Sequence, residues 1–381
     1  MNILLVTDAN VERGGICMFM LQWIESITAM NIDAHICVYF RKGILDEKLA
    51  DQYRKMGVEL ILGDLPQKQT SWSLTNRNRV RSDIRNILRN RRYDILHVNS
   101  SALGFTALAL TEGLRAKVPM RISHAHGQNT YKKLKIKCLW IVRKYNKLIA
   151  TRYAGCSVEA GRFQFGRGID KDPRWIWIAN TISAEKYAFD PSAREKGRME
   201  LAVSEDMILL GATGALIRQK NHLFNLEILS SLKKNGFKAK LLILGEGIER
   251  EILEKTIEEK DIKNDVILYG VSRDIPKWLS SMDIYLMPSI YEGFGIAALE
   301  AQSSGLPCIL SDQVASEVAI SSDVYRLPID QGVQSWTDCI IKMKHKSNKE
   351  RERGKENVIR AGFDMQSTTE YICKLYEIRR H

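Results

Sequence analysis

The chain has 381 residues, of which 45% are hydrophobic and 27% charged, and its formal net charge is +12. This length suits two domains of ordinary size, and the composition is that of a globular protein, not of a disordered or fibrous one. No stretch approaches the roughly twenty consecutive apolar residues of a membrane-spanning helix. Seven scattered cysteines without a C-x-x-C pair argue against a zinc site or a disulfide framework and favour reduced thiols.

Short apolar runs alternate with longer amphipathic stretches. In the first half we expect helices at 16–29, 76–90 and 102–114, and strands at 3–6, 34–39, 59–62, 95–98, 120–123 and 153–156. After residues 175–178 the alternation restarts, with strands expected at 207–210, 240–244, 265–269, 283–287 and 308–310. Such alternation indicates parallel sheets covered on both faces. Two series predict two doubly wound α/β domains, with a boundary near residues 179–185. The N-terminus resembles a buried strand and lacks the features of a signal peptide.

The basic excess lies in one half of the chain. Residues 1–190 carry 30 Lys and Arg against 17 Asp and Glu, whereas residues 191–381 carry 27 against 28. An asymmetry this complete suggests an anionic partner for the first half. No recognised nucleic-acid motif accompanies the charge, so we expect no nucleic acid among the partners.

The densest basic segment, residues 131–145, alternates cations with large apolar side chains. If it is helical, one stripe contains Leu134, Cys138, Ile141 and Tyr145. A basic amphipathic helix with tryptophan can lie on an anionic membrane surface. It can equally pack its stripe on its own domain, and the pattern does not choose between the two.

The run EGFGIAALE, residues 292–300, is the most informative stretch. It follows an expected strand and contains a glycine turn, Gly293 to Gly295, before an expected helix at 296–303. The start of a helix after such a turn suits a phosphate. The carboxylates of Glu292 and Glu300 do not bind phosphate, but they accept hydrogen bonds from hydroxyl groups. The combination predicts a sugar-nucleotide site.

Other expected loops also follow strands, where ligands bind in parallel sheets. Gly14 and Gly15 follow the first strand, and paired glycines let a backbone approach a diphosphate closely. His124 and His126 follow the strand ending at 123, and without a nearby carboxylate they would make a weak metal site. Gly245 and Gly247 form half of a dinucleotide fingerprint, which is weak without the third glycine.

The residues 292–300 and the following Gly305-Leu-Pro307 resemble the late signature of the retaining glycosyltransferases of family 4, E-G-F-G-x-x-x-x-E followed by G-x-P. The resemblance extends over essentially the whole chain. It implies the GT-B fold, in which two Rossmann-like domains face each other across a cleft and the last helix, here 366–380, crosses back to the first domain. The implied domains are residues 1–182 with 366–381, and residues 183–365.

The same resemblance implies roles for single residues. Glu300 would hold the ribose and Glu292 a hydroxyl of the donor sugar. His126 would hold the sugar near its reacting carbon, with His124 as the second candidate for this role. The donor's diphosphate would be bound by Arg218, Lys220 and the backbone of Gly14, Gly15, Gly293, Phe294, Gly295 and Ile296. The family pattern G-R-x-x-x-x-K departs here, because Ala215 occupies the arginine position and Arg218 lies three residues later. Arginine can grip two phosphate oxygens, which alanine cannot.

The implied activity is retaining transfer of a sugar from a nucleotide-sugar, expected to be a UDP-sugar. The expected acceptor is a polyprenyl-diphosphate-linked saccharide in capsule, exopolysaccharide or O-antigen synthesis. We expect a cytoplasmic protein, peripheral at the inner face of the membrane, without a metal cofactor. The triplet Asp170-Lys-Asp172 is interpreted as a loop and not as a metal site. A sugar-nucleotide epimerase, a catalytically impaired interaction subunit and a nucleic-acid-binding protein remain alternatives.

Overall fold

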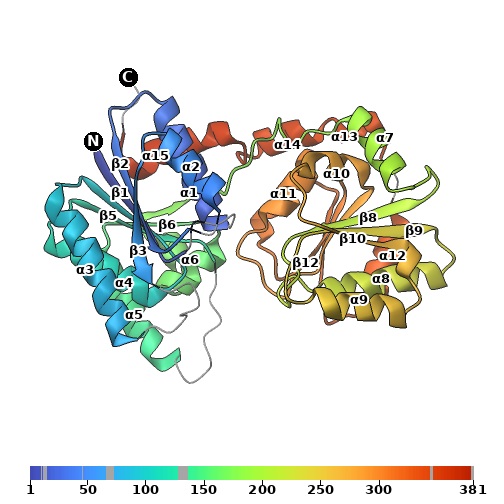
Figure 1. Ribbon diagram of the computed structural model, residues 1–381, viewed down its shortest axis with the longest axis horizontal. Helices are drawn as coiled ribbons and strands as arrows, with labels where there is room; N and C mark the ends of the chain where they lie inside the picture. The colour runs from blue at the N-terminus through green and yellow to red at the C-terminus, as the bar shows by residue number, and fades with distance from the viewer. Residues whose placement is uncertain are drawn as a thin grey trace. The chain divides into compact units, whose positions relative to one another are not determined.

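A computed structural model of the chain describes residues 1–9, 11, 15–44, 46–65, 73–127, 136–343 and 346–378. The chain divides into two compact units. The N-terminal unit comprises Met1–Thr181 and Met365–His381, and the C-terminal unit comprises Ile182–Asp364. Each contains one parallel sheet with helices on both of its faces (Figure 1).

The sheet of the N-terminal unit has seven parallel strands in the order β3-β2-β1-β4-β5-β6-β7. They are β1 (Asn2–Thr7), β2 (His35–Lys42), β3 (Glu59–Leu65), β4 (Ile95–Asn99), β5 (Met120–Ala125), β6 (Arg152–Gly155) and β7 (Trp175–Trp177). The helices are α1 (Gly15–Ala29), α2 (Glu47–Lys55), α3 (Leu74–Asn90), α4 (Leu103–Arg115), α5 (Ile136–Ile149), α6 (Val158–Phe165), α15 (Met365–Tyr376) and the 3-10 turn η2 (Ile169–Lys171). The expected strand–helix alternation is confirmed.

The C-terminal helix α15 belongs to the N-terminal unit and packs on α1 (Figure 1). Ile372 and Leu375 are fully buried in the same apolar cluster as the inward face of α1. The helix was expected to run to residue 380, but it ends at Tyr376 because Glu377 adopts a positive φ of 56°, outside the right-handed helical region.

The sheet of the C-terminal unit has six parallel strands in the order β10-β9-β8-β11-β12-β13. They are β8 (Ile208–Thr213), β9 (Ala239–Leu244), β10 (Val266–Gly270), β11 (Ile284–Met287), β12 (Cys308–Ser311) and β13 (Val324–Leu327). The helices are α7 (Pro191–Glu200), α8 (His222–Lys234), α9 (Arg250–Glu259), α10 (Ile275–Ser281), α11 (Ile296–Ser303), α12 (Val333–Lys342), α13 (Asn348–Arg351) and α14 (Gly354–Arg360), with the 3-10 turns η3 (Lys263–Asp265) and η4 (Ser316–Val318). No helix within the described ranges is both long enough and apolar enough to span a bilayer.

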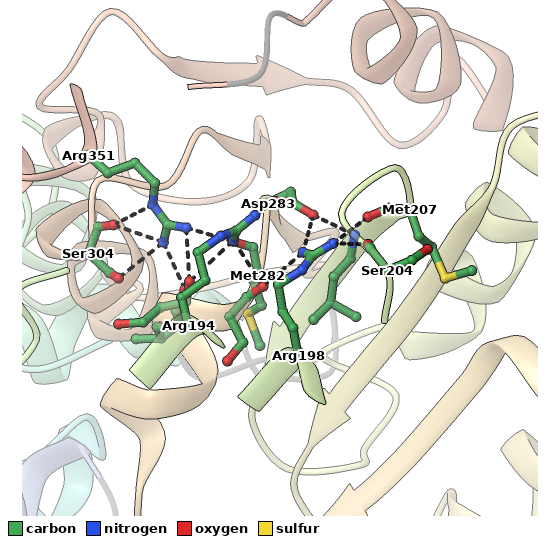
Figure 2. A network of polar contacts seen from close by, with 12 residues as sticks. Arg194, Arg198, Ser204, Met207, Met282, Asp283, Ser304 and Arg351 are labelled. Atoms are coloured by element: carbon green, nitrogen blue, oxygen red, sulfur yellow. Dashed lines mark hydrogen bonds and ion pairs between the residues drawn. The ribbon is translucent and has the colours of Figure 1, made fainter. Parts of the chain in front are cut away.

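A buried polar network fixes the amino end of β11 (Figure 2). The carboxylate of Asp283 accepts from Arg194 at 2.6 Å, from Arg198 at 2.8 Å and from the Leu209 amide at 2.8 Å. Burial alone would raise the pKa of Asp283, but attraction to the two arginines outweighs it, so the pKa is lowered. The network joins α7 to the amino ends of β8 and β11. The loops that follow these two strands lie at the opposite, carboxyl end of the sheet.

Arg351 completes this network and is itself 3% exposed. Its guanidinium donates to the carbonyl oxygens of Leu279, Ser280, Met282 and Ser304 at 2.9–3.1 Å. Replacing Arg351 by methionine would leave these oxygens without that donor. We expect a loss of about 3 kcal/mol or more in the stability of the C-terminal unit, since each unsatisfied buried group costs about 1–3 kcal/mol.

Hydrogen exchange of the amides in β11 and α11 measures this loss locally in the full chain. The matched control is Arg353→Met, because Arg353 is exposed and lies two residues further on. The control is expected to change stability by no more than about 0.5 kcal/mol. Equal protection in both variants would contradict the structural role assigned to Arg351.

Candidate functional site

In the C-terminal sheet the direction of strand succession reverses between β8 and β11. Strands β9 and β10 extend the sheet on one side and β12 and β13 on the other. Ligands of open parallel sheets bind at the carboxyl ends of the strands beside such a reversal. The loops that follow β8 and β11, residues 214–221 and 288–295, are those that the sequence analysis singled out.

Hydrogen bonds hold these two loops together although some 70 residues separate them. The Ile290 amide donates to the Gln219 carbonyl at 2.8 Å, and the Gln219 side chain donates to the Tyr291 carbonyl at 3.0 Å. The Asn221 side chain donates to the Pro288 carbonyl at 3.2 Å. The loops therefore form one surface whose parts are fixed relative to one another.

Lys220 and Glu292 form an ion pair on this surface. Their side chains are 21% and 15% exposed, so the pair is partly enclosed but still reachable by solvent. An ammonium group has three donor hydrogens, and a carboxylate has about four acceptor positions. Each partner therefore keeps capacity for a ligand, and the pair places a cation and a hydroxyl acceptor side by side.

The glycine turn leads directly into α11. Gly295 has a φ of +98°, and a Cβ there would lie 3.1 Å from the Val314 side chain, so this position requires glycine. Phe294 is 2% exposed and its ring lies 5.6 Å from that of Phe363. Its side chain therefore belongs to the core, and only its backbone can serve a ligand. Ile296 is the first residue of α11.

Glu300 lies in the second turn of α11 and is partly buried. Loss of hydration at its carboxyl group raises the pKa to about 7, although a hydrogen bond from the Tyr187 hydroxyl and the charge of Lys186 lower it. The side chain is thus not a solvated surface glutamate. A carboxyl group with this pKa changes charge when a ligand offers it further donors.

Arg218 is exposed, and within the described part of the chain it makes no hydrogen bond or ion pair. Ala215, at the arginine position of the family pattern, is exposed as well. The guanidinium of Arg218 therefore has no partner among the described residues, and it lies two positions before Lys220 in the same loop.

Gly245 and Gly247 serve loop packing. A Cβ on Gly245 would lie 1.9 Å from the Gly214 carbonyl oxygen, and one on Gly247 would lie 2.3 Å from that of Leu216. These glycines let the loop after β9 touch the loop after β8. The close contact between the loops explains why glycine occupies both positions of the partial dinucleotide fingerprint.

In the N-terminal unit the equivalent reversal lies between β1 and β4. Gly15 is the first residue of α1, while Gly14 lies outside the described residues. His126 follows β5, and its Nε2 lies 2.9 Å from Oδ1 of Asn99 at the end of β4. The rings of His124 and His126 stack with centroids 4.1 Å apart.

Asp8 is a residue that the sequence analysis missed. It follows β1, and burial raises the pKa of its carboxyl group against the opposing effects of a hydrogen bond with Ser100 and the charge of Arg41. Its signal in the sequence was its position directly after the first strand. Asp8 and Ser100 bring the ends of β1 and β4 together at the reversal.

The triplet with Asp170 and Asp172 lies in and beside η2. Asp172 pairs with Arg174 at 3.1 Å and Asp170 with Arg162 at 3.8 Å, so both carboxylates already have cationic partners. Among the residues that the structure describes, no group of three or more His, Cys, Asp or Glu side chains is arranged to hold a metal ion. Metal independence stays a prediction.

Helix α5 presents apolar side chains outward. Trp140 is 57% exposed, Ile141 56% and Leu148 80%. With Lys144 and Lys147 they line a shallow hollow of about 680 Å³. Of the expected stripe, Ile141 and Tyr145 do not pack into the core, while Leu134 lies outside the described residues.

Known proteins resemble this chain in sequence and in fold. Residues 193–360 match the model of the glycosyl transferases group 1. EpsF of Bacillus subtilis is 28% identical over 302 residues, or 78% of each chain. The Escherichia coli UDP-Gal:alpha-D-GlcNAc-diphosphoundecaprenol alpha-1,3-galactosyltransferase is 26% identical over 302 residues, or 76% of each chain. The crystal structure of Anabaena Alr3699/HepE in complex with UDP superposes with a TM-score of 0.76 at 16% identity, covering 99% of this chain and 100% of that one.

Proposed function

We propose that the chain, which has the GT-B fold, is a group 1 glycosyltransferase that transfers a sugar from a UDP-sugar to a lipid-linked saccharide with retention at the anomeric carbon. The acceptor we propose is a saccharide on a polyprenyl diphosphate, in the assembly of capsule, exopolysaccharide or O-antigen. The proposal includes a position at the cytoplasmic face of the membrane.

The observation that carries the proposal is the Lys220–Glu292 pair at the strand reversal, with Glu300 on the helix that follows. We assign Glu292 to a hydroxyl of the donor sugar and Glu300 to the ribose hydroxyls. Lys220, Arg218 and the backbone of Gly293, Phe294, Gly295 and Ile296 would stabilise the leaving diphosphate. His126 would orient the sugar, and Gly14 and Gly15 would approach the diphosphate.

The chemistry needs no covalent intermediate on the protein. As the bond between the anomeric carbon and the diphosphate breaks, the acceptor oxygen forms its bond on the same face. The proton of the acceptor hydroxyl passes to an oxygen of the leaving diphosphate. Fixed cations and helix dipoles favour the charge that develops there, since they are oriented before the reaction begins.

Two related proteins support the choice of donor and acceptor. Alr3699/HepE has been crystallised with UDP and with UDP-glucose. The Escherichia coli relative is named for a UDP-galactose donor and a diphosphoundecaprenol-linked acceptor. Both properties belong to those proteins, and we carry them to this chain as part of the proposal.

The test is donor consumption with and without a polyprenyl-diphosphate saccharide, after a screen of thermal stabilisation by UDP- and GDP-sugars. The proposal predicts stabilisation by a UDP-sugar and release of UDP that depends on the acceptor. Conversion of the sugar nucleotide without an acceptor would instead support an epimerase. Binding without any turnover would support a catalytically impaired interaction subunit.

We further propose that the outward face of α5 lies on an anionic membrane. Tryptophan and leucine beside lysine suit the boundary between headgroups and acyl chains, where cations meet phosphate and the rings enter the apolar layer. The segment from residue 113 to residue 158 contains eleven Lys and Arg and no Asp or Glu. Such a position would bring the enzyme to an acceptor that is itself held in the membrane.

Replacing both Trp140 and Leu148 by alanine is expected to weaken binding to phosphatidylglycerol-containing vesicles by about tenfold or more. Each buried large apolar side chain contributes about 1.5–3 kcal/mol, and about 1.4 kcal/mol is a factor of ten. Vesicle co-sedimentation measures the change. The control is Ile248→Ser, because Ile248 is 90% exposed and belongs to the C-terminal unit. Equal binding by the double variant and the wild type would refute this surface.

A further inference from the structure

A buried chain of hydrogen bonds connects α15 with the end of β5 in the N-terminal unit. Nε1 of Trp23 lies 2.9 Å from the Tyr376 hydroxyl, which lies 2.9 Å from Nδ1 of His97. Nε2 of His97 in turn lies 3.1 Å from Nδ1 of His124. Each of these four residues is at most 4% exposed.

One direction of this chain gives every hydrogen inside it an acceptor. The indole N–H of Trp23 can only donate, so the Tyr376 oxygen accepts from it. His97 is the one other partner of the Tyr376 hydroxyl among the described residues, so the buried hydrogen of Tyr376 has an acceptor only if it points to Nδ1 of His97. Nδ1 of His97 is therefore an acceptor, and the proton of that ring is on Nε2. This N–H donates to Nδ1 of His124, which places the proton of His124 on its Nε2.

The chain ends on a donor that the fold itself does not satisfy. Nε2 of His124 is buried and has no hydrogen-bond partner in the described part of the chain. A buried N–H without a partner costs about 1–3 kcal/mol, so it is rarely retained without a use.

Asn99 fixes the neighbouring histidine in the same way. Its Nδ2 donates to the His97 carbonyl at 3.3 Å, so its Oδ1 is the atom that faces Nε2 of His126. That nitrogen must carry the proton, and Nδ1 of His126 is left with a bare lone pair. The residue His126 retains some exposure, and its ring stacks on His124.

We propose that Tyr376, His97 and Asn99 are positioning residues that lock both His124 and His126 as Nε2–H tautomers. The pair then offers a hydroxyl-bearing ligand one donor, Nε2 of His124, and one acceptor, Nδ1 of His126. The ligand class rests on the proposed function, in which the hydroxyls belong to the donor sugar or the acceptor. The tautomers themselves follow from the hydrogen bonds and from the need of a buried hydroxyl hydrogen for an acceptor, independently of any ligand.

Burial favours the neutral rings on which this arrangement depends. Loss of hydration lowers the pKa of His97 and of His126 to about 3, and it also lowers the pKa of His124. An imidazolium would have two donors and no acceptor, so protonation of His126 would remove the offered lone pair. The histidines therefore act through tautomer and not through charge near neutral pH.

The tautomers can be measured without any ligand, by two-bond ¹H–¹⁵N correlation spectra of the full chain labelled at histidine. We expect Nε2 protonated and Nδ1 bare in His97, His124 and His126. An Nδ1–H tautomer at His124 or His126 in the wild-type chain would overturn the proposal, and this measurement needs no variant to fold.

Two variants separate the two branches of the network. Tyr376→Phe removes the donor to His97, so a second set of resonances in the opposite tautomer is expected for His97 and His124 but not for His126. Asn99→Leu is expected to produce a second set of resonances for His126 but not for His97 and His124. The control is Tyr371→Phe on the same helix, which should alter none of the three. Unchanged tautomers in both test variants would show that the network does not set them.

Addition of UDP-glucose tests the ligand part separately. A hydroxyl that donates to Nδ1 of His126 should change the ¹⁵N chemical shift of that nitrogen from the value of an unprotonated ring nitrogen without a hydrogen bond. An unmoved resonance while UDP-glucose demonstrably stabilises the chain against heat would overturn the acceptor role of His126. Absence of stabilisation by UDP-glucose would count against the proposed donor and would leave the tautomer assignment standing.

Discussion

Replacement of Glu292 by glutamine is expected to lower the kcat of sugar transfer by about 10²- to 10³-fold, the cost of removing one fixed electrostatic contact from a transition state. Glutamine keeps the size of the side chain and an acceptor oxygen, but it loses the negative charge that pairs with Lys220 and that would strengthen the proposed hydrogen bond from the sugar hydroxyl. Affinity for the free nucleotide should change far less, because the released Lys220 becomes fully available to the diphosphate.

Single-turnover transfer and equilibrium binding of UDP distinguish these two effects. Glu258→Gln is the matched control, since Glu258 is an exposed glutamate on α9 of the same unit. The combination of Glu292→Gln with Lys220→Met should cost less than the sum of the single changes, because the two side chains are in contact. Wild-type transfer by the glutamine variant would remove Glu292 from the mechanism.

Most of the strand and helix pattern was predictable because its signal is local. Short apolar runs such as residues 240–244 became buried strands, as in β9. Two short edge strands, β7 and β13, were not among the strands expected from the sequence. β13 has no fully buried residue, and β7 has three residues, so neither carries a strong alternating signal.

The candidate site was partly predictable for a different reason. Lys220 and Glu292 were each proposed from their place in a motif, but their ion pair depends on β8 and β11 lying side by side. That neighbourhood follows from strand order, which a local pattern does not contain. The glycines at 245 and 247 show the same limit, since their role is contact with another loop.

The buried networks were beyond the sequence altogether. Arg351 looks like one charge among many in a basic run, yet it lies in the core and satisfies backbone oxygens far away in the sequence. Tyr376 reaches His97 across 279 positions. Tertiary packing decides which polar residues are buried. Hydrogen-bond partners that are far apart in the chain leave no local pattern in a single sequence.

Glu300 should make both stability and donor binding depend on pH. Its pKa in the folded chain is about 7, above the ordinary value of 4.5. Its contribution to stability is therefore full below about pH 4.5 and is lost as the pH rises through about 7. Glu300→Gln stays neutral throughout, so its melting temperature should exceed that of the wild type by a few degrees at pH 8 and by much less at pH 5.

Binding should show the opposite trend. In the role proposed for Glu300, ribose hydroxyls donate to the carboxylate, so the bound state favours the ionised form and a proton must leave first. With a pKa of about 7 in the free protein, the affinity for UDP-glucose should rise about tenfold between pH 6 and pH 8. UDP-glucose suits this measurement because its diphosphate does not titrate in that range, and calorimetry in buffers of different ionisation enthalpy counts the released protons. The dependence should vanish in Glu300→Gln and persist in Glu258→Gln. If wild-type affinity is flat across this range, Glu300 does not meet the ribose as a carboxylate, and the hydroxyl-binding role must pass to another residue.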